Sequence, residues 1–200
     1  MKDTLVADTL VADTFVADTF VADAFVGLGS NAGDRAAHLR AAVRALARLP
    51  GTRLVAVSPV YETEAHVLPG QPPQPDHLNA AAQLATTLAP EALLAHLHAI
   101  EAARGRRRNT DVWQPRPLDL DLLLYADLLL RAGHAPGAPG GLVVPHPRLA
   151  ARRFVLAPLA DLAPGRRVPG LGRTVRDLLR STSDRARVAP FRLDLSSALR

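Results

Sequence analysis

The stretch of residues 118–125 constrains the fold of this chain more than any other, because it combines a run of leucines with two aspartates at alternate positions. An apolar run that ends in a tyrosine predicts a buried strand. Side chains two residues apart on a strand point to the same face. Asp119 and Asp121 would therefore project together, about 6 to 7 Å apart along the strand, with the neighbouring leucines on the opposite face.

The paired carboxylates also predict a chemistry. Two ionised carboxylates repel each other unless a cation lies between them. Magnesium prefers carboxylate oxygens and usually keeps its other positions for water and substrate phosphates. Asp119 and Asp121 therefore predict a magnesium-nucleotide site. A solvated strand face at the edge of a sheet would give the same pattern.

The composition suits one globular domain, or one domain with tails, since 48% of the 200 residues are hydrophobic. Cysteine is absent, which excludes disulfides, thiolate metal sites and a cysteine nucleophile. No apolar stretch reaches the length of about 18 residues that a membrane-spanning helix needs, and the amino terminus lacks the pattern of a secretory signal. We expect a cytoplasmic protein, and we expect it to be a monomer.

The charge of the chain is unevenly distributed. Residues 146–200 contain twelve Arg and four Asp, a net charge of +8, whereas residues 1–23 contain one Lys and five Asp. A basic stripe is the electrostatic footprint of nucleic-acid binding. Against that alternative, the sequence shows no zinc-finger spacing and no aromatic-basic platform, and 23 of the 24 basic residues are Arg, which indicates a compositional bias. We therefore do not expect nucleic acid as a partner.

The sequence divides into three regions. Residues 1–23 repeat a pentapeptide, and a period of five matches neither a helix face nor strand alternation. We expect this segment to be a disordered or loosely paired extension, or a mis-assigned start, and we assign it no function. Residues 24–182 form the predicted domain, and residues 183–200 form a basic carboxy-terminal tail.

The predicted elements alternate in a recognisable order, strand-helix-strand-strand-helix-strand. They lie at 25–29, 34–49, 54–61, 78–88, 90–103 and 118–125, and a short strand at 142–144 and helical segments follow. This order is typical of a ferredoxin-like α+β fold, a mostly antiparallel sheet with helices packed on one face. Two long loops, 62–76 and 104–117, have lengths that indicate a function.

The second long loop is rich in arginines. Arg104, Arg106 and Arg108 precede the aspartates, and Arg116 lies three residues before Asp119. Guanidinium groups suit phosphate oxygens, and arginines on loops can close on a substrate. A solvated basic loop is the alternative, but the adjacent aspartate pair favours phosphate.

Glycines and a histidine leave further alternatives open. The spacing of Gly27, Gly29 and Gly33 does not match a dinucleotide-binding motif, so we favour glycines that allow a tight turn. The side chain of Asn31, at the top of the predicted sheet, could contact a ligand. His146 lies between two prolines, where it could bind phosphate or cap a loop.

Five motifs then appear in a fixed order: Phe25-Val26-Gly27-Leu28-Gly29-Ser30-Asn31; Tyr61-Glu62-Thr63; Asp76-His77-Leu78-Asn79-Ala80-Ala81; Trp113-Gln114-Pro115-Arg116-Pro117-Leu118-Asp119-Leu120-Asp121; and Val144-Pro145-His146-Pro147 through Arg152-Arg153-Phe154. With these motifs the chain resembles the 6-hydroxymethyl-7,8-dihydropterin pyrophosphokinases of folate biosynthesis over about residues 24–165. The resemblance implies transfer of pyrophosphate from magnesium-ATP, the co-substrate, to the pterin hydroxymethyl group, with release of AMP.

The resemblance also implies roles for single residues. Asp119 and Asp121 would hold two magnesium ions, which neutralise charge in an in-line displacement, and Arg106 and Arg116 would close over the transferred group. The residues expected to contact ATP are Glu101, Arg108, His146 and Arg152. The residues expected to hold the pterin are Thr63, His77, Asn79, Trp113 and Phe154.

Three positions depart from the family pattern. His77 stands where the family usually has Tyr or Phe, so we expect weaker stacking on the pterin and a possible pH dependence. Gln114 replaces a small residue, and the loop after Thr63 is longer than usual. If these changes spoil the pocket, the chain would be a degenerate homologue that binds nucleotide without turnover.

Overall fold

The computed structural model describes residues 21–65, 73–106, 114–130 and 141–199. The strands are β1 (Ala22–Ser30), β2 (Thr52–Val57), β3 (Val60–Thr63), β4 (His77–Thr86), β5 (Asp119–Tyr125) and β6 (Val188–Phe191). The helices are α1 (Arg35–Leu46), α2 (Pro90–Ala103), α3 (Arg153–Leu162) and α4 (Val175–Ser181), with short 3₁₀ turns at Leu149–Ala151 and Ser196–Leu199. The pentapeptide-repeat segment, residues 1–23, lies almost entirely outside the described residues.

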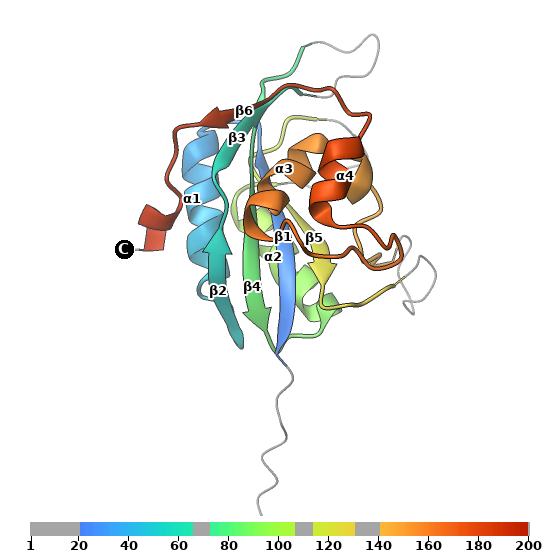
Figure 1. Cartoon of the computed structure of the whole chain (residues 1–200). Helices are drawn as coiled ribbons and strands as arrows, with labels where there is room; N and C mark the ends of the chain where they lie inside the picture. Colours follow the sequence, from blue (N-terminus) through green and yellow to red (C-terminus); the bar gives the residue numbers. More distant parts are fainter. Residues whose placement is uncertain (1–20, 66–72, 107–113, 131–140, 200) are drawn as a thin grey trace, which may run out of the picture.

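One antiparallel sheet organises these elements (Figure 1). Its strand order is β5-β1-β4-β3-β6, and β2 pairs with β4 beside β3. The predicted strand 54–61 is therefore two strands, which pair with different halves of β4. Ser58 lies at the break, where its hydroxyl accepts a hydrogen bond from the Ala81 amide at 2.9 Å, and Pro59 follows with no amide hydrogen to donate.

The helices cover both faces of the sheet, so the prediction that they cover one face is wrong. Helices α1 and α2 pack on one face through Leu39, Val43 and Leu97, among others. Helices α3 and α4 pack on the opposite face around Phe25 and Leu156. The one-face prediction rests on the order of the first six elements, whereas the second layer is formed by α3 and α4, which follow them in the chain. The α+β class itself is confirmed.

Local signals explain where the first two helices begin. The Asp34 carboxylate caps α1 by accepting a hydrogen bond from the Ala37 amide at 2.9 Å. Helix α2 begins with Pro90, whose fixed φ and missing N–H are tolerated in a first helical turn. Leu93 and Leu97 are buried on one face of α2, because residues four apart lie on the same side of a helix. None of the described helices is long and apolar enough to span a bilayer.

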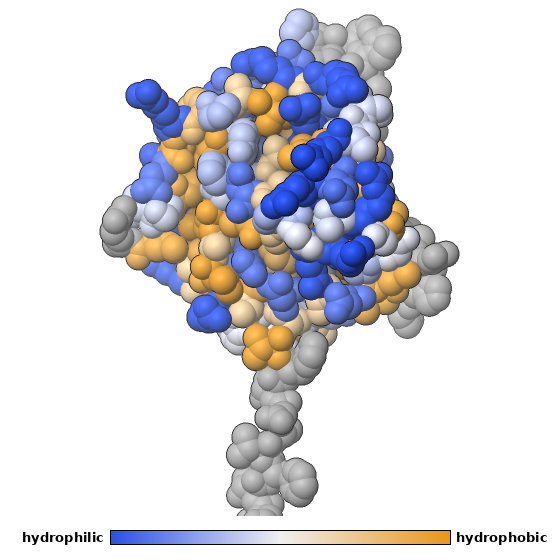
Figure 2. All heavy atoms as spheres, in the orientation of Figure 1, coloured by the Kyte–Doolittle hydropathy of each residue, from blue (hydrophilic) through white to orange (hydrophobic). Residues whose placement is uncertain are grey.

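The carboxy-terminal segment contributes a strand that the sequence analysis did not predict. Val188–Phe191 forms β6, which pairs antiparallel with β3. Leu195 beyond it is 2% exposed and belongs to the core on the α1 side. Exposed arginines of the same third of the chain, such as Arg176 and Arg180, lie on α4, and Figure 2 shows hydrophilic side chains gathered over the face that carries α3 and α4.

Candidate active site

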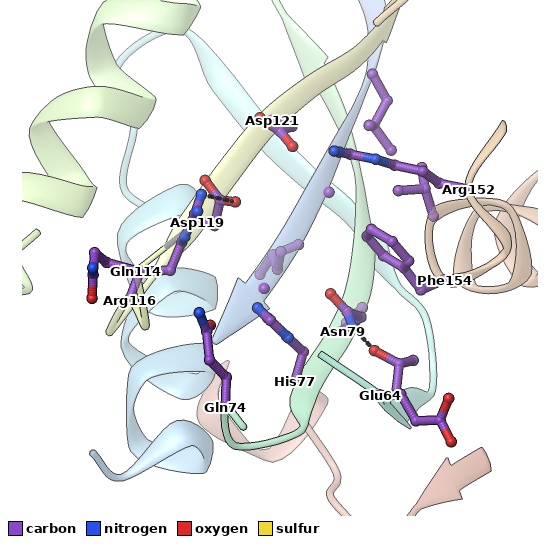
Figure 3. A pocket seen from close by; sticks show the side chains of 17 residues that line it. Glu64, Gln74, His77, Asn79, Gln114, Arg116, Asp119, Asp121, Arg152 and Phe154 are labelled. Carbon is purple, nitrogen blue, oxygen red and sulfur yellow. Dashed lines mark hydrogen bonds and ion pairs between the residues drawn. The ribbon is translucent and has the colours of Figure 1, made fainter. Parts of the chain in front are cut away.

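An open pocket lies on the α3 side of the sheet, where β1, β4 and β5 meet the first turn of α3. Its empty volume, including the mouth, is about 850 Å³. Figure 3 shows Asp119, Asp121 and Arg116 along one side of the pocket and His77, Asn79 and Phe154 along the other. The pocket is lined by Gly27, Leu28, Gly29, Thr63, Glu64, Gln74, His77, Asn79, Ala80, Gln114, Arg116, Asp119, Asp121, Leu123, Arg152, Phe154 and Val155.

The two aspartates point into this pocket from β5, as predicted. The leucines at the intervening positions, Leu120 and Leu122, are buried in the core on the α1 side. The Asp119 carboxylate forms an ion pair with Arg106 and a second one with Arg116 at 3.0 Å. The Asp121 carboxylate lies 4.0 Å from the His146 ring nitrogen Nε2.

The two carboxylates differ in their electrostatic environment. Burial opposes ionisation of Asp119, but the Arg106 and Arg116 guanidiniums outweigh it and lower the pKa of this carboxyl. Burial raises the pKa of Asp121, and the negative charge of Asp119 raises it further. Asp121 therefore bears an electrostatic cost that a bound cation would relieve.

Glu101 lies behind Asp119, at the end of α2, and is 1% exposed. Its carboxylate forms an ion pair with Arg106 and accepts a hydrogen bond from the Leu120 amide at 2.8 Å. Glu101 and Arg106 line a separate hollow beside α2 and not the main pocket. The observed contacts of Glu101 therefore position Arg106 and the edge of β5.

The opposite wall of the pocket combines polar and aromatic groups. The Asn79 amide nitrogen donates a hydrogen bond to the Thr63 hydroxyl at 2.7 Å, and both side chains are buried. The Phe154 ring faces the same space, with the Arg152 guanidinium 5.4 Å from the ring centroid. Burial lowers the pKa of His77 to about 4, and the charge of Arg116 contributes. The His77 imidazole is therefore uncharged at neutral pH.

Two glycines form the floor of the pocket. Gly27 and Gly29 lie within β1, so the tight-turn interpretation is wrong for them; it holds for Gly33, whose φ is +63°. A Cβ atom on Gly29 would lie 3.2 Å from the Asn79 side-chain oxygen. Gly29 therefore keeps the space between Asp119 and Asn79 open.

Asn31 connects the two long loops, a role that the sequence analysis missed. Its side-chain oxygen accepts a hydrogen bond from the Arg116 amide at 2.8 Å. Its amide nitrogen donates to the Pro75 carbonyl at 3.3 Å and to the Gln74 side chain at 3.4 Å. The residue is fully buried, so it contacts protein groups on both sides. No local pattern signals these contacts, because the partners are 43 or more positions away.

The structure thus brings most of the predicted site residues together. Thr63, His77, Asn79, Arg116, Asp119, Asp121, Arg152 and Phe154 line one pocket, and Glu101, Arg106 and His146 adjoin its aspartates. Arg108 and Trp113 lie outside the described residues. The roles assigned to these residues remain predictions.

The donor set of the pocket fits magnesium better than a metal held wholly by protein. The part of the chain that the structure describes contains no cluster of three or more His, Cys, Asp or Glu side chains with metal-binding geometry. Two carboxylates with open space in front of them match an ion that keeps water and substrate phosphates in its other positions.

Comparison with known proteins agrees with this geometry. Residues 25–164 match the family model of 7,8-dihydro-6-hydroxymethylpterin-pyrophosphokinase (HPPK). The chain is 47% identical to the 2-amino-4-hydroxy-6-hydroxymethyldihydropteridine pyrophosphokinase of Pseudomonas aeruginosa, over 77% of this chain and 88% of that protein. It is 43% identical to the enzyme of the same name from Methylorubrum extorquens, over 77% of this chain and 89% of that one.

A solved structure shares the fold. A crystal structure of a Plasmodium falciparum HPPK-DHPS triple mutant with pteroate superposes with a TM-score of 0.62 at 15% sequence identity. The match covers 80% of this chain and 43% of that one, so this chain spans less than half of the solved protein. On the family match and these identities, the chain belongs to the 7,8-dihydro-6-hydroxymethylpterin-pyrophosphokinase family.

Proposed function

We propose that the pocket between β5 and β4 is the site where this chain transfers pyrophosphate from ATP to 6-hydroxymethyl-7,8-dihydropterin. The reaction itself follows from the family, and it yields the pterin diphosphate and AMP in folate biosynthesis. One observation carries the assignment of the site. On one side of a single pocket lie the carboxylates of Asp119 and Asp121, and two arginines form ion pairs with Asp119. On the other side lie the hydrogen-bonded Asn79 and Thr63 and the Phe154 ring.

The carboxylate side suits the triphosphate of ATP. Asp119 and Asp121 would hold magnesium, two ions in this proposal, which neutralises charge on the phosphates when bound. Arg106 and Arg116 offer guanidinium N–H groups that can donate to phosphate oxygens. His146 and Arg152 lie on the Asp121 side, where they would contact the nucleotide, and we assign Arg108 to it as well.

The opposite wall suits the pterin. Asn79 and Thr63 carry amide and hydroxyl groups that match the edge of a pterin, and Phe154 can stack on its face. We propose that His77 stacks on the other face as an uncharged ring, and that Trp113 helps to close the site. The pterin hydroxyl would then face the carboxylate side, where the phosphates are held in line with it.

Assays of AMP release test the proposal. Purified protein is mixed with ATP, magnesium and the pterin, and pterin-dependent AMP is measured. Asp119→Asn should lower kcat by more than about 100-fold, because electrostatic groups aimed at transferring phosphates supply barrier reductions of that order. The matched control is Asp127→Asn, whose carboxylate is 90% exposed and pairs with Arg166. Asp119→Asn with wild-type kcat, or AMP release that persists in excess EDTA, would contradict the proposed site.

We also propose that the chain acts as a cytoplasmic monomer on these small molecules and not on nucleic acid. Its co-substrate ATP is supplied in the cytoplasm, and described residues of one chain line both sides of the pocket. Light scattering at assay concentration tests the monomer, since a mass of twice 21.3 kDa would contradict it.

A further inference from the structure

Strands β6, β3 and β4 lie side by side at one corner of the sheet. This corner adjoins the wall of the pocket formed by Thr63, His77, Asn79 and Phe154, which we call the pterin wall. In the register of the sheet, Val188 of β6 pairs with Thr63 of β3, and Thr63 pairs with His77 of β4. The next position outward on each strand holds a charged residue. These are Arg187, Glu64 and Asp76, which therefore form a row directly beyond the row of Val188, Thr63 and His77.

Arg187 bridges the other two members of this row. Its Nη2 lies 2.6 Å from an Asp76 carboxylate oxygen, and its Nε lies 4.0 Å from a Glu64 carboxylate oxygen. The Asp76 contact is also a hydrogen bond. A single guanidinium of the carboxy-terminal segment therefore joins the end of β3 to the beginning of β4.

A second arginine, at the beginning of α1, contacts the same junction between the end of β3 and the beginning of β4. Arg35, the first residue of α1, forms an ion pair with Glu62 of β3 at 3.0 Å. The same guanidinium donates a hydrogen bond to the Asp76 backbone carbonyl at 2.7 Å. Asp76 is thus held through its carboxylate by Arg187 and through its carbonyl by Arg35.

The residues of this junction are continuous in sequence with residues of the pterin wall. Glu64 lines the pocket, His77 follows Asp76 without an intervening residue, and Thr63 precedes Glu64. Among the described residues, Arg187 is the cation that pairs with the carboxylates of Glu64 and Asp76. These carboxylates lie on adjacent strand ends, where like charges repel if the cation is removed. The repulsion would displace the ends of β3 and β4 that carry Thr63 and His77.

We propose that Arg187 is a positioning residue for the pterin site, through which β6 and the carboxy-terminal segment set the affinity for the pterin. This inference rests on the proposed function of the pocket. The family model ends at residue 164, so the arginine that makes this connection lies beyond the matched region. The carboxylate side of the pocket, formed by β5 and the residues before it, does not contact Arg187 through any of these ion pairs.

The expected effect is selective for one substrate. Arg187 is 51% exposed, and exposed ion pairs contribute up to about fivefold in an equilibrium constant. Arg187→Gln should therefore raise the KM for the pterin about two- to fivefold and leave the KM for ATP and kcat unchanged. Arg187→Lys, which keeps the charge, should recover part of the difference. Arg192→Gln, at an exposed arginine of the same segment, is the matched control and should behave as wild type.

The salt dependence of the pterin KM distinguishes a role of this ion pair from a purely structural role of the side chain. Raising the salt concentration screens exposed ion pairs, so it should raise the pterin KM of the wild type toward that of Arg187→Gln and change the variant less. If Arg187→Gln lowers the melting temperature too far for kinetics, Asp76→Asn removes the same ion pair from the other side.

The possible failures are distinguishable. A wild type without pterin-dependent AMP release overturns the proposed function. An active wild type with equal pterin KM values for Arg187→Gln and Arg192→Gln overturns the positioning role. Equal rises in the KM for ATP and for the pterin also overturn it, because a general loss of structure would affect both substrates.

Discussion

Glu101 offers the sharpest test of how the carboxylate side is held. Its side chain is 1% exposed, and its carboxylate accepts a hydrogen bond from the Leu120 amide. Leu120 lies on β5, which ends the described strand order, so its outward N–H has no strand to pair with. Glu101 supplies the acceptor that a neighbouring strand would otherwise provide, and it also neutralises Arg106.

The magnitude follows from these two contacts. A buried N–H left without an acceptor costs about 1–3 kcal/mol. Breaking a buried ion pair costs about 3–5 kcal/mol, but Arg106 is 17% exposed and keeps Asp119, so we expect less than that. Glu101→Ala should lower the free energy of unfolding by about 3–5 kcal/mol in total. Glu101→Gln keeps an oxygen acceptor for Leu120, so it should cost only about 1–2 kcal/mol.

Urea unfolding followed by circular dichroism measures both variants. Since domains of this size unfold with about 5–15 kcal/mol, Glu101→Ala should still fold, with an unfolding midpoint at clearly lower urea. Glu91→Gln, at an exposed residue in the first turn of the same helix, is the control and should stay within about 0.5 kcal/mol of wild type. A Glu101→Ala midpoint equal to wild type, or a Gln variant as unstable as the Ala variant, would refute the reasoning.

Three further predictions concern other parts of the site. Burial lowers the pKa of His77 in the folded protein to about 4, below its usual 6.5. Between these values the unfolded chain binds a proton that the folded chain does not, so stability is lost as the pH falls from 6.5 toward 4. In urea unfolding, His77→Gln should lose less stability than wild type over that range, and parallel losses would contradict the prediction. Gly29→Ala places a Cβ 3.2 Å from the Asn79 oxygen and should weaken pterin binding measured by calorimetry. In Gly27→Ala the Cβ lies 3.4 Å from the Leu123 side chain and not beside Asn79, so this variant should bind more like wild type. Asn31→Ala removes three hydrogen bonds and should lower stability by about 2–4 kcal/mol together with kcat/KM for both substrates; unchanged kinetics would show that the two loops do not depend on it.

The sequence alone predicted the features that depend on local periodicity. The alternation of residues 118–125 was enough to place Asp119 and Asp121 on one face, because side chains on any strand alternate whatever surrounds it. The predicted element 90–103 matches α2, whose first residue is Pro90, a residue that local rules favour in a first helical turn. The motif order indicated the family, which the comparisons confirm.

Tertiary structure decided what local patterns leave open. Strand β6 and the bonds of Asn31 join residues that are between 43 and 131 positions apart, and the second helical layer packs α3 and α4 against Phe25 of β1. Arg187 reaches Asp76 across 111 positions. A polar or charged residue gives the same local sequence pattern whether its side chain faces water or contacts a distant residue. The contact forms only when the chain folds and the strands pair. The sequence therefore determined which side chains could form a phosphate site, and the folded sheet decided which residues hold that site in place.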